Sequence, residues 1–337
     1  MRVVFGAAHN AELTVQPMIG RLLTAGALTL FGNFACAAAL EPSNRDVSTL
    51  ASQAPIAARS LAELHSYLRG REANVDLFRM RGPFGVAIHE NRNVGVTRAE
   101  RIKADLFLSS PAEKAPLVIF LHGHDSSKGA HARQAAHLAS WGMHSLSVQL
   151  PGNGPWETNG RTLSRLVSTI YSAPEAIDTR VDRSRIILVG HSFGAYAVAF
   201  ALAGGAPAAG AILLDPAAAR TDVPNFLRRI RKPVMVIGAD EVVSPARNRE
   251  LFYELVRNGV AEVSIRDAAH EDAQYPSEFA LQNGGVDPST TEALQVTFVA
   301  ALTAAAVSLS ATGAFEYAWM SFRPLLQDGR LFNAKRK

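Results

Sequence analysis

The sequence predicts an α/β fold: a mostly parallel, doubly wound sheet with antiparallel strands at its N-terminal side. Short apolar runs recur along the chain, and most are followed by a Gly, Pro or Asp turn and then a helical stretch. Runs that are apolar on both faces indicate buried parallel strands, and strands that alternate with helices indicate βαβ units. The predicted strands are 117–121, 145–150, 186–189, 211–214, 234–237 and 261–265.

The segments on either side of these runs have other patterns. Residues 41–80 are polar and Ala-rich, and the spacing of Leu61, Leu64 and Leu68 predicts one helix. Apolar and polar residues alternate at 86–88 and 102–108, which predicts half-buried antiparallel strands. Residues 290–312 are apolar and Ala-rich but broken by Thr and Ser, which favours a buried terminal helix over a membrane span.

We expect the chain to divide into a signal peptide (1–39), a leader with a helix (40–80), one α/β domain (84–308) and a C-terminal extension (309–337).

A length of 337 residues and 48% hydrophobic residues suit a globular chain with a sizeable core. One cysteine excludes a disulfide scaffold and any multi-cysteine metal site. The net charge of +4, without a dense basic block beyond the last three residues, gives no indication of nucleic-acid binding.

The N-terminal segment has the parts of a secretory signal peptide. Residues 22–40 carry no charge, follow Arg21 and end in small residues. We expect a secreted or periplasmic protein, with Met18 as a possible true start. Two alternatives stay open: an uncleaved membrane anchor, the one case in which a membrane would be a partner, and a lipoprotein modified at Cys36.

A G-x-S-x-G pattern lies between a predicted strand and a predicted helix, and consists of Gly190, His191, Ser192, Phe193 and Gly194. A serine on so sharp a turn has a strained backbone, and side chains at the two glycine positions would collide with neighbouring elements. The turn would raise the Ser192 hydroxyl above the sheet edge and aim the Phe193 amide at the same place.

From 84 to 308 the chain resembles the α/β-hydrolase family, in the form of a secreted bacterial serine esterase or lipase-like enzyme without a large cap domain. The resemblance rests on four motifs in the family's order, each at a strand end: His122-Gly123-His124, the Ser192 elbow, Asp240 in Gly-Ala-Asp, and His270 in Ala-His-Glu-Asp.

This resemblance implies a role for each residue. Ser192 would be the nucleophile, His270 the general base, and Asp240 the acid that orients the base. The backbone amides of His124 and Phe193 would form the oxyanion hole. Asp215, after the strand at 211–214, is the alternative acid, because some members of the family use that position.

Neither a cofactor nor a metal is expected. The chain has no dinucleotide fingerprint and no phosphate loop. Its histidines at 122, 124, 131, 137 and 144 do not have the spacing of a metallohydrolase site.

The resemblance implies hydrolysis of carboxylic esters through an acyl-enzyme. Residues 216–232 are too few for a large cap, so we expect an open site or one covered only by a loop at 151–160, where Trp156 could line a pocket. A small-molecule, lipid or polymeric ester is the expected substrate. An acyltransferase, a thioesterase, an amidase and an inactive binding module stay open as alternatives.

Overall fold

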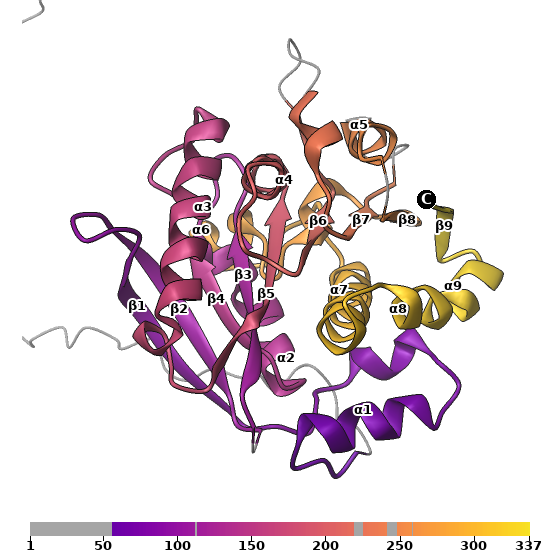
Figure 1. The fold of residues 1–337 in the computed structure, drawn as a ribbon. Coiled ribbons are helices and arrows are strands. Elements are labelled where there is room, and N and C mark those ends of the chain that lie inside the picture. Colours follow the sequence, from indigo (N-terminus) through magenta and orange to yellow (C-terminus); the bar gives the residue numbers. More distant parts are fainter. Residues whose placement is uncertain (1–55, 112, 219–224, 241–247, 258) are drawn as a thin grey trace, which may run out of the picture. The chain divides into compact units, whose positions relative to one another are not determined.

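The computed structural model describes residues 56–111, 113–218, 225–240, 248–257 and 259–337. In this part of the chain the strands form a nine-stranded sheet in the order β1-β2-β4-β3-β5-β6-β7-β8-β9 (Figure 1). Pairing is parallel from β4 through β8 and antiparallel at β1–β2, β2–β4 and β8–β9. The strands are β1 (Val86–Gly95), β2 (Arg101–Ser109), β3 (Ala115–Leu121), β4 (His144–Val148), β5 (Val181–His191), β6 (Gly210–Leu214), β7 (Val234–Gly238), β8 (Val260–Ile265) and β9 (Leu331–Arg336).

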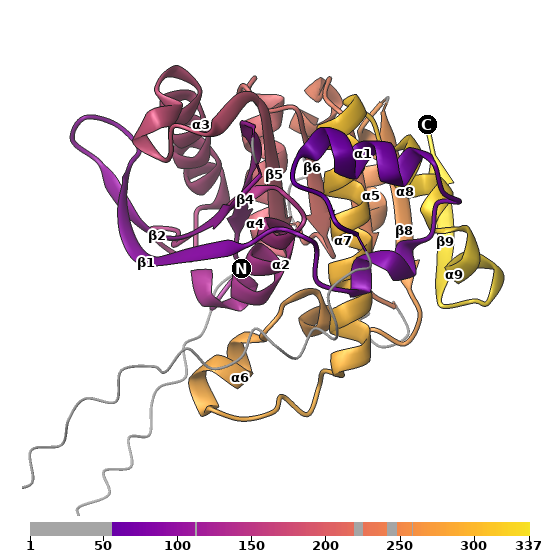
Figure 2. The same cartoon turned by 90° about the horizontal axis from the view of Figure 1, so that it is seen from below.

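Helices cover both faces of this sheet, as a doubly wound fold requires (Figures 1 and 2). The α-helices are α1 (Leu61–Arg69), α2 (Ala132–Ser140), α3 (Trp156–Ser172), α4 (Phe193–Ala203), α5 (Asn248–Leu255), α6 (Glu278–Asn283), α7 (Glu292–Thr312), α8 (Glu316–Ser321) and α9 (Arg323–Gln327). The 3-10 turns are η2 (Val75–Arg79), η3 (Lys128–His131), η4 (Pro174–Ala176), η5 (Asn225–Arg229) and η6 (His270–Ala273).

Alternate residues of each parallel strand enter two different cores. In β3, Val118 and Phe120 pack with α1, α2 and α7, whereas Leu117, Ile119 and Leu121 pack with α3, α4 and α5. Successive side chains of a strand point to opposite faces, so a continuous apolar run serves both layers. The expected α/β class, with its antiparallel N-terminal strands, is confirmed.

The edges of the sheet differ from expectation in two places. β1 is mostly exposed rather than half-buried, because it is the outermost strand and only β2 pairs with it. At the other edge, the C-terminal extension supplies β9, which pairs antiparallel with β8. Its sequence, LFNAKR, has no strand periodicity, and only Leu331 is fully buried, as is usual for an exposed edge strand.

Two segments near the ends of the chain bear on earlier expectations. The predicted helix around Leu61 is α1, whose first turn is capped by the Ser60 side chain accepting from the Glu63 amide. α7 is the one helix of the described residues long and apolar enough to span a bilayer, but 83% of its most apolar window is buried in the protein. It is therefore the core helix that its sequence predicts. The proposed signal peptide lies outside the described residues.

The expected loop at 151–160 is shorter than predicted. α3 begins at Trp156, so only residues 151–155 are loop. Gly160 explains why a helix fits there: a Cβ at this position would lie 2.9 Å from the Ala197 carbonyl oxygen of α4, so glycine lets the two helices approach closely. Trp156 is thus the first residue of a helix that packs closely on α4.

Candidate active site

Ser192 lies on a strained turn between β5 and α4. Its backbone has φ 55° and ψ −126°, which is unfavourable for a residue with a side chain. Glycine is required on both sides: a Cβ on Gly190 would lie 2.5 Å from the Gly194 carbonyl oxygen, and one on Gly194 would lie 2.3 Å from the His122 carbonyl oxygen. The turn therefore holds the serine between the ends of β3 and β5.

His270 opens η6, after β8, and its side chain reaches back to the end of β6. Its Nδ1 lies 2.6 Å from Oδ2 of Asp215. The other oxygen, Asp215 Oδ1, accepts a hydrogen bond from the Ala239 amide at 3.0 Å. Asp215 is 4% exposed, so water competes little for the carboxylate. This contact fixes the imidazole with the proton on Nδ1 and Nε2 as the basic nitrogen.

The expectation that Asp240 orients His270 is wrong, and the alternative, Asp215, occupies that position. The Asp240 carboxylate accepts from the Asp267 amide at 3.0 Å and lies 4.0 Å from the Arg266 guanidinium. It thus braces the turn after β8. Strand order contributes to this: β6 is next to β5, which leads directly into Ser192, and β7 is one strand further away. A backbone hydrogen bond also holds Asp215 near Ser192, because the Ser192 amide donates to the carbonyl of Leu214, the residue before Asp215.

The environment of His270 favours its protonated form. Burial lowers the pKa of its imidazole, but the hydrogen bond and charge of Asp215, together with the charge of Glu271, outweigh burial and raise the pKa above 6.5. An imidazole with a raised pKa takes up a proton readily, which is the property that a general base needs.

His122 holds the turn that follows β3. The Leu150 amide donates to its Nε2 at 3.1 Å, and a backbone amide can only donate. The ring proton must therefore be on Nδ1, which donates to the Gly123 carbonyl oxygen at 2.9 Å. Because a trans peptide is planar, fixing this carbonyl also fixes the direction of the His124 N–H in the same peptide.

The amides of His124 and Phe193 are the two expected oxyanion donors. Within the part of the chain that the structure describes, neither N–H has an acceptor. A Cβ on Gly123 would lie 2.9 Å from the Ser192 Cβ, so the His122–His124 turn runs directly beside Ser192. Phe193 is the first residue of α4, where the unpaired amides of a helix start favour an anion.

Three aromatic rings pack on one another next to the Ser192 turn, and one of them belongs to Phe193, the residue after Ser192. The Trp156 ring is stacked on Phe193, with centroids 5.3 Å apart and planes 13° apart. The His124 ring lies edge-on to both, at 6.4 and 6.3 Å. Glu157, the neighbour of Trp156, accepts from the Tyr196 hydroxyl of α4 at 2.6 Å. This bond ties the start of α3 to the helix that carries Phe193.

Gln274 and Glu278 were not predicted from the sequence, yet their side chains hydrogen-bond residues next to the Ser192 turn and after β3. Glu278, on α6, accepts from the Ser127 amide at 2.9 Å and from the Ser127 hydroxyl at 2.8 Å. Gln274 contacts His191 and Ser126. Both follow His270 without a motif, and polar residues in such a segment are usually solvated, so nothing in the sequence distinguished them.

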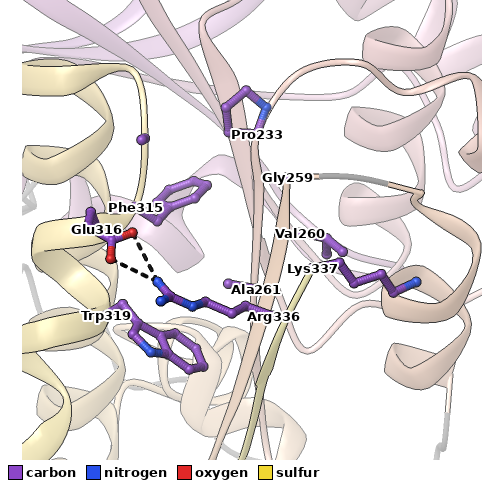
Figure 3. A pocket seen from close by; sticks show the side chains of 10 residues that line it. Pro233, Gly259, Val260, Ala261, Phe315, Glu316, Trp319, Arg336 and Lys337 are labelled. Atoms are coloured by element: carbon purple, nitrogen blue, oxygen red, sulfur yellow. Dashed lines mark hydrogen bonds and ion pairs between the residues drawn. The ribbon is translucent and has the colours of Figure 1, made fainter.

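Two further features of the described residues bear on where a site could lie. No group of three or more His, Cys, Asp or Glu side chains among them could hold a metal. A cavity of about 440 Å³ opens at the amino ends of β7 and β8, next to Pro233 and Gly259 (Figure 3). The Arg336 guanidinium in it pairs with Glu316 at 3.0 Å, and its lining includes no Ser, Thr, Cys or His side chain. It lies at the amino ends of the parallel strands, whereas Ser192 follows the carboxyl end of β5.

Comparison with known proteins agrees with this geometry. A model of the alpha/beta hydrolase family matches residues 118–328, which include Ser192, Asp215 and His270. A search of curated proteins gives no match.

Proposed function

Since the chain belongs to the alpha/beta hydrolase family, a family of hydrolases, we propose that it is a serine hydrolase that cleaves carboxylic esters through an acyl-enzyme. Ser192 is the nucleophile, His270 the general base and Asp215 the acid that orients the base. The observation that carries the proposal is the hydrogen bond between the buried Asp215 carboxylate and the partly exposed His270 ring, beside the strained Ser192 turn.

The chemistry follows from these positions. Nε2 of His270 removes the hydroxyl proton as Ser192 Oγ attacks the ester carbon, because a serine is too weakly acidic to react alone. The tetrahedral intermediate collapses when the imidazolium returns that proton to the leaving alcohol. Water then repeats the sequence on the acyl-enzyme. Asp215 keeps the ring in the correct tautomer and stabilises its charged form.

The amides of His124 and Phe193 receive the negative charge that develops on the carbonyl oxygen. Such a donor contributes about 2.7–4 kcal/mol to the transition state when it is already aimed at the oxyanion. The His122–Gly123 hydrogen bond supports this role, because it holds the His124 peptide in place before substrate arrives.

The first experiment measures initial rates on p-nitrophenyl esters of two, four, eight and twelve carbons, with the wild type and Ser192→Ala. Turnover that disappears in the variant, together with labelling of Ser192 by a fluorophosphonate, is the expected result. A folded wild type that neither turns over an ester nor reacts with the fluorophosphonate would contradict the proposal. Adding an acceptor alcohol to the same assay distinguishes hydrolysis from acyl transfer.

We also propose that residues 1–39 direct export, on the sequence pattern alone. Expression of the full chain, followed by fractionation and N-terminal sequencing, tests this. A shortened chain in the periplasm or medium is expected, and an intact chain in the cytoplasm would contradict it.

A further inference from the structure

His191 connects the nucleophile to the main chain of the base. It precedes Ser192 directly and is 2% exposed. Its Nε2 lies 3.1 Å from the backbone carbonyl oxygen of His270, and the two imidazole rings have centroids 4.4 Å apart. Ser192 is therefore linked to the backbone of His270 through its peptide bond to His191 and the hydrogen bond of the His191 side chain.

The direction of each hydrogen bond in this link can be assigned. The Glu278 amide, which can only donate, donates to Gln274 Oε1 at 2.9 Å. The other end of the Gln274 amide group is thus NH₂, and it donates to His191 Nδ1 at 3.1 Å. Because Nδ1 accepts, the proton of a neutral His191 is on Nε2, which donates to the His270 carbonyl. A backbone amide at the start of α6 in this way selects the tautomer of His191.

A neutral His191 is what its surroundings require. Burial lowers the pKa of His191 well below 6.5, and the nearby rings of His270, His131 and His122 lower it further. Protonation would also put a second donor on Nδ1, facing the Gln274 NH₂. During the reaction His270 becomes positively charged, and a neutral neighbour at this distance adds no repulsion.

We propose that His191 and Gln274 are a positioning pair that sets the place of His270 relative to Ser192. The inference rests on the proposed function and deepens it. Asp215 fixes the rotation of the His270 ring, whereas the pair fixes the backbone from which the ring projects. Both residues are buried, at 2% and 5% exposed, so we assign them no contact with substrate. Their contribution is the alignment of a base with a nucleophile, where a displacement of about 1 Å can cost about a hundredfold in rate.

The variants His191→Leu, His191→Gln and Gln274→Glu test the pair. Leu removes the donor to the His270 carbonyl, whereas a Gln amide can replace Nε2 as that donor. Gln274→Glu replaces the NH₂ that faces Nδ1 with an oxygen and so favours the wrong tautomer or a charged ring. His137→Leu is the matched control: His137 is also buried and its Nε2 contacts a backbone carbonyl, that of Phe78 at 2.8 Å, remote from Ser192.

We expect kcat of His191→Leu to fall about tenfold to a hundredfold with KM little changed. His191→Gln should recover most of this loss, and Gln274→Glu should lose activity. The double variant His191→Leu/Gln274→Glu should lose no more than His191→Leu alone, because the two act through one hydrogen bond. His137→Leu should lower Tm without lowering kcat. Equal kcat in wild type and His191→Leu, or an equal loss in His137→Leu, would overturn the proposal.

A second readout does not depend on activity or on the fold of His191→Leu. The nitrogen NMR spectrum of the wild-type histidines should show His191 neutral with its proton on Nε2, and the Gln274→Glu spectrum should differ. An Nδ1–H or charged His191 in the wild type would overturn the pair. An inert wild type with this tautomer would instead contradict the esterase proposal alone.

Discussion

Asp215 and His270 are 55 positions apart in the chain, yet Asp215 Oδ2 and His270 Nδ1 are separated by 2.6 Å. The contact crosses the end of β7, because Asp215 follows β6 and His270 follows β8. Parallel strands bring their carboxyl ends to one edge, so residues from three different turns can share one site there. The position of the acid is therefore a property of the strand order and of how each turn directs its carboxylate.

The two carboxylates should differ sharply on substitution. We expect Asp215→Asn to lower kcat/KM about a thousandfold to ten-thousandfold, because an amide at this position favours the wrong tautomer of His270. Asp240→Asn keeps an oxygen that can accept from the Asp267 amide, and should leave kcat/KM nearly unchanged. Ester hydrolysis by the purified variants checks both. A larger loss in Asp240→Asn would restore Asp240 as the acid.

The pH profile should report the environment of His270. Ester hydrolysis needs the neutral ring, and the pKa of His270 is raised by Asp215, so kcat/KM should fall as the pH drops through a value above 6.5. In Asp215→Asn the charge of Asp215 is lost while burial remains, so this acid limb should move to lower pH. A limb at the same pH in both proteins would show that another group titrates.

The two glycines of the Ser192 turn should not tolerate even a methyl group. Gly194→Ala would press a Cβ against the His122 carbonyl at 2.3 Å and so displace the turn that carries the His124 amide. We expect a loss of both Tm and kcat. Gly204→Ala, at the end of α4, is the control: its Cβ would meet nothing closer than 3.4 Å, and its Tm should stay within a few degrees of wild type. Thermal unfolding and ester hydrolysis of the two variants make the comparison.

Buried histidines should make the fold sensitive to mild acid. Burial lowers the pKa of His131, His137 and His144 to about 4. Below pH 6.5 the unfolded chain protonates these residues while the folded chain does not, so unfolding takes up protons and stability falls as the pH falls from 6.5 toward 4. His270, whose pKa is raised, acts in the opposite direction and above pH 6.5, where the folded chain keeps a proton that the unfolded chain releases.

His137 can be replaced by a residue that does not titrate but can make the same hydrogen bond. His137→Gln keeps a donor for the Phe78 carbonyl but has no titratable ring. Between pH 7.5 and 5.5 the variant should lose about 1 kcal/mol less unfolding free energy than the wild type. Urea unfolding at the two pH values measures this. An equal loss in both proteins would mean that His137 does not contribute.

Trp156 should influence substrate binding through its ring. Because this half-buried ring is stacked on Phe193, beside the nucleophile, we expect Trp156→Ala to raise KM roughly tenfold for the longer acyl esters. Trp319→Ala, on α8, is the control with unchanged KM. A lower Tm in Trp156→Ala without a change in KM would show that the ring only packs the start of α3.

Local patterns in the sequence carried most of the fold. The apolar runs that became β3 to β8 are short and continuous, and such runs have few alternatives to a buried parallel sheet. The Ser192 turn was equally readable, since its Gly-x-Ser-x-Gly pattern lies within five residues. Only Gly190 answers a local clash, with the Gly194 carbonyl, whereas Gly194 answers the His122 carbonyl at the end of another strand. The exposed β1 and β9 were harder to predict, because an edge strand buries little and so imposes little pattern.

The sequence by itself thus determined the fold class, the strained serine turn and a histidine after the last parallel strand. Only the tertiary structure decided which carboxylate meets that histidine, because Asp215 and Asp240 both follow buried strands and have the same local pattern. It also decided that His191, Gln274 and Glu278 form one chain of hydrogen bonds behind the site. Which side chains meet depends on how the turns at the carboxyl ends of neighbouring strands direct them. The distance between two such side chains cannot be derived from the number of residues between them in the chain.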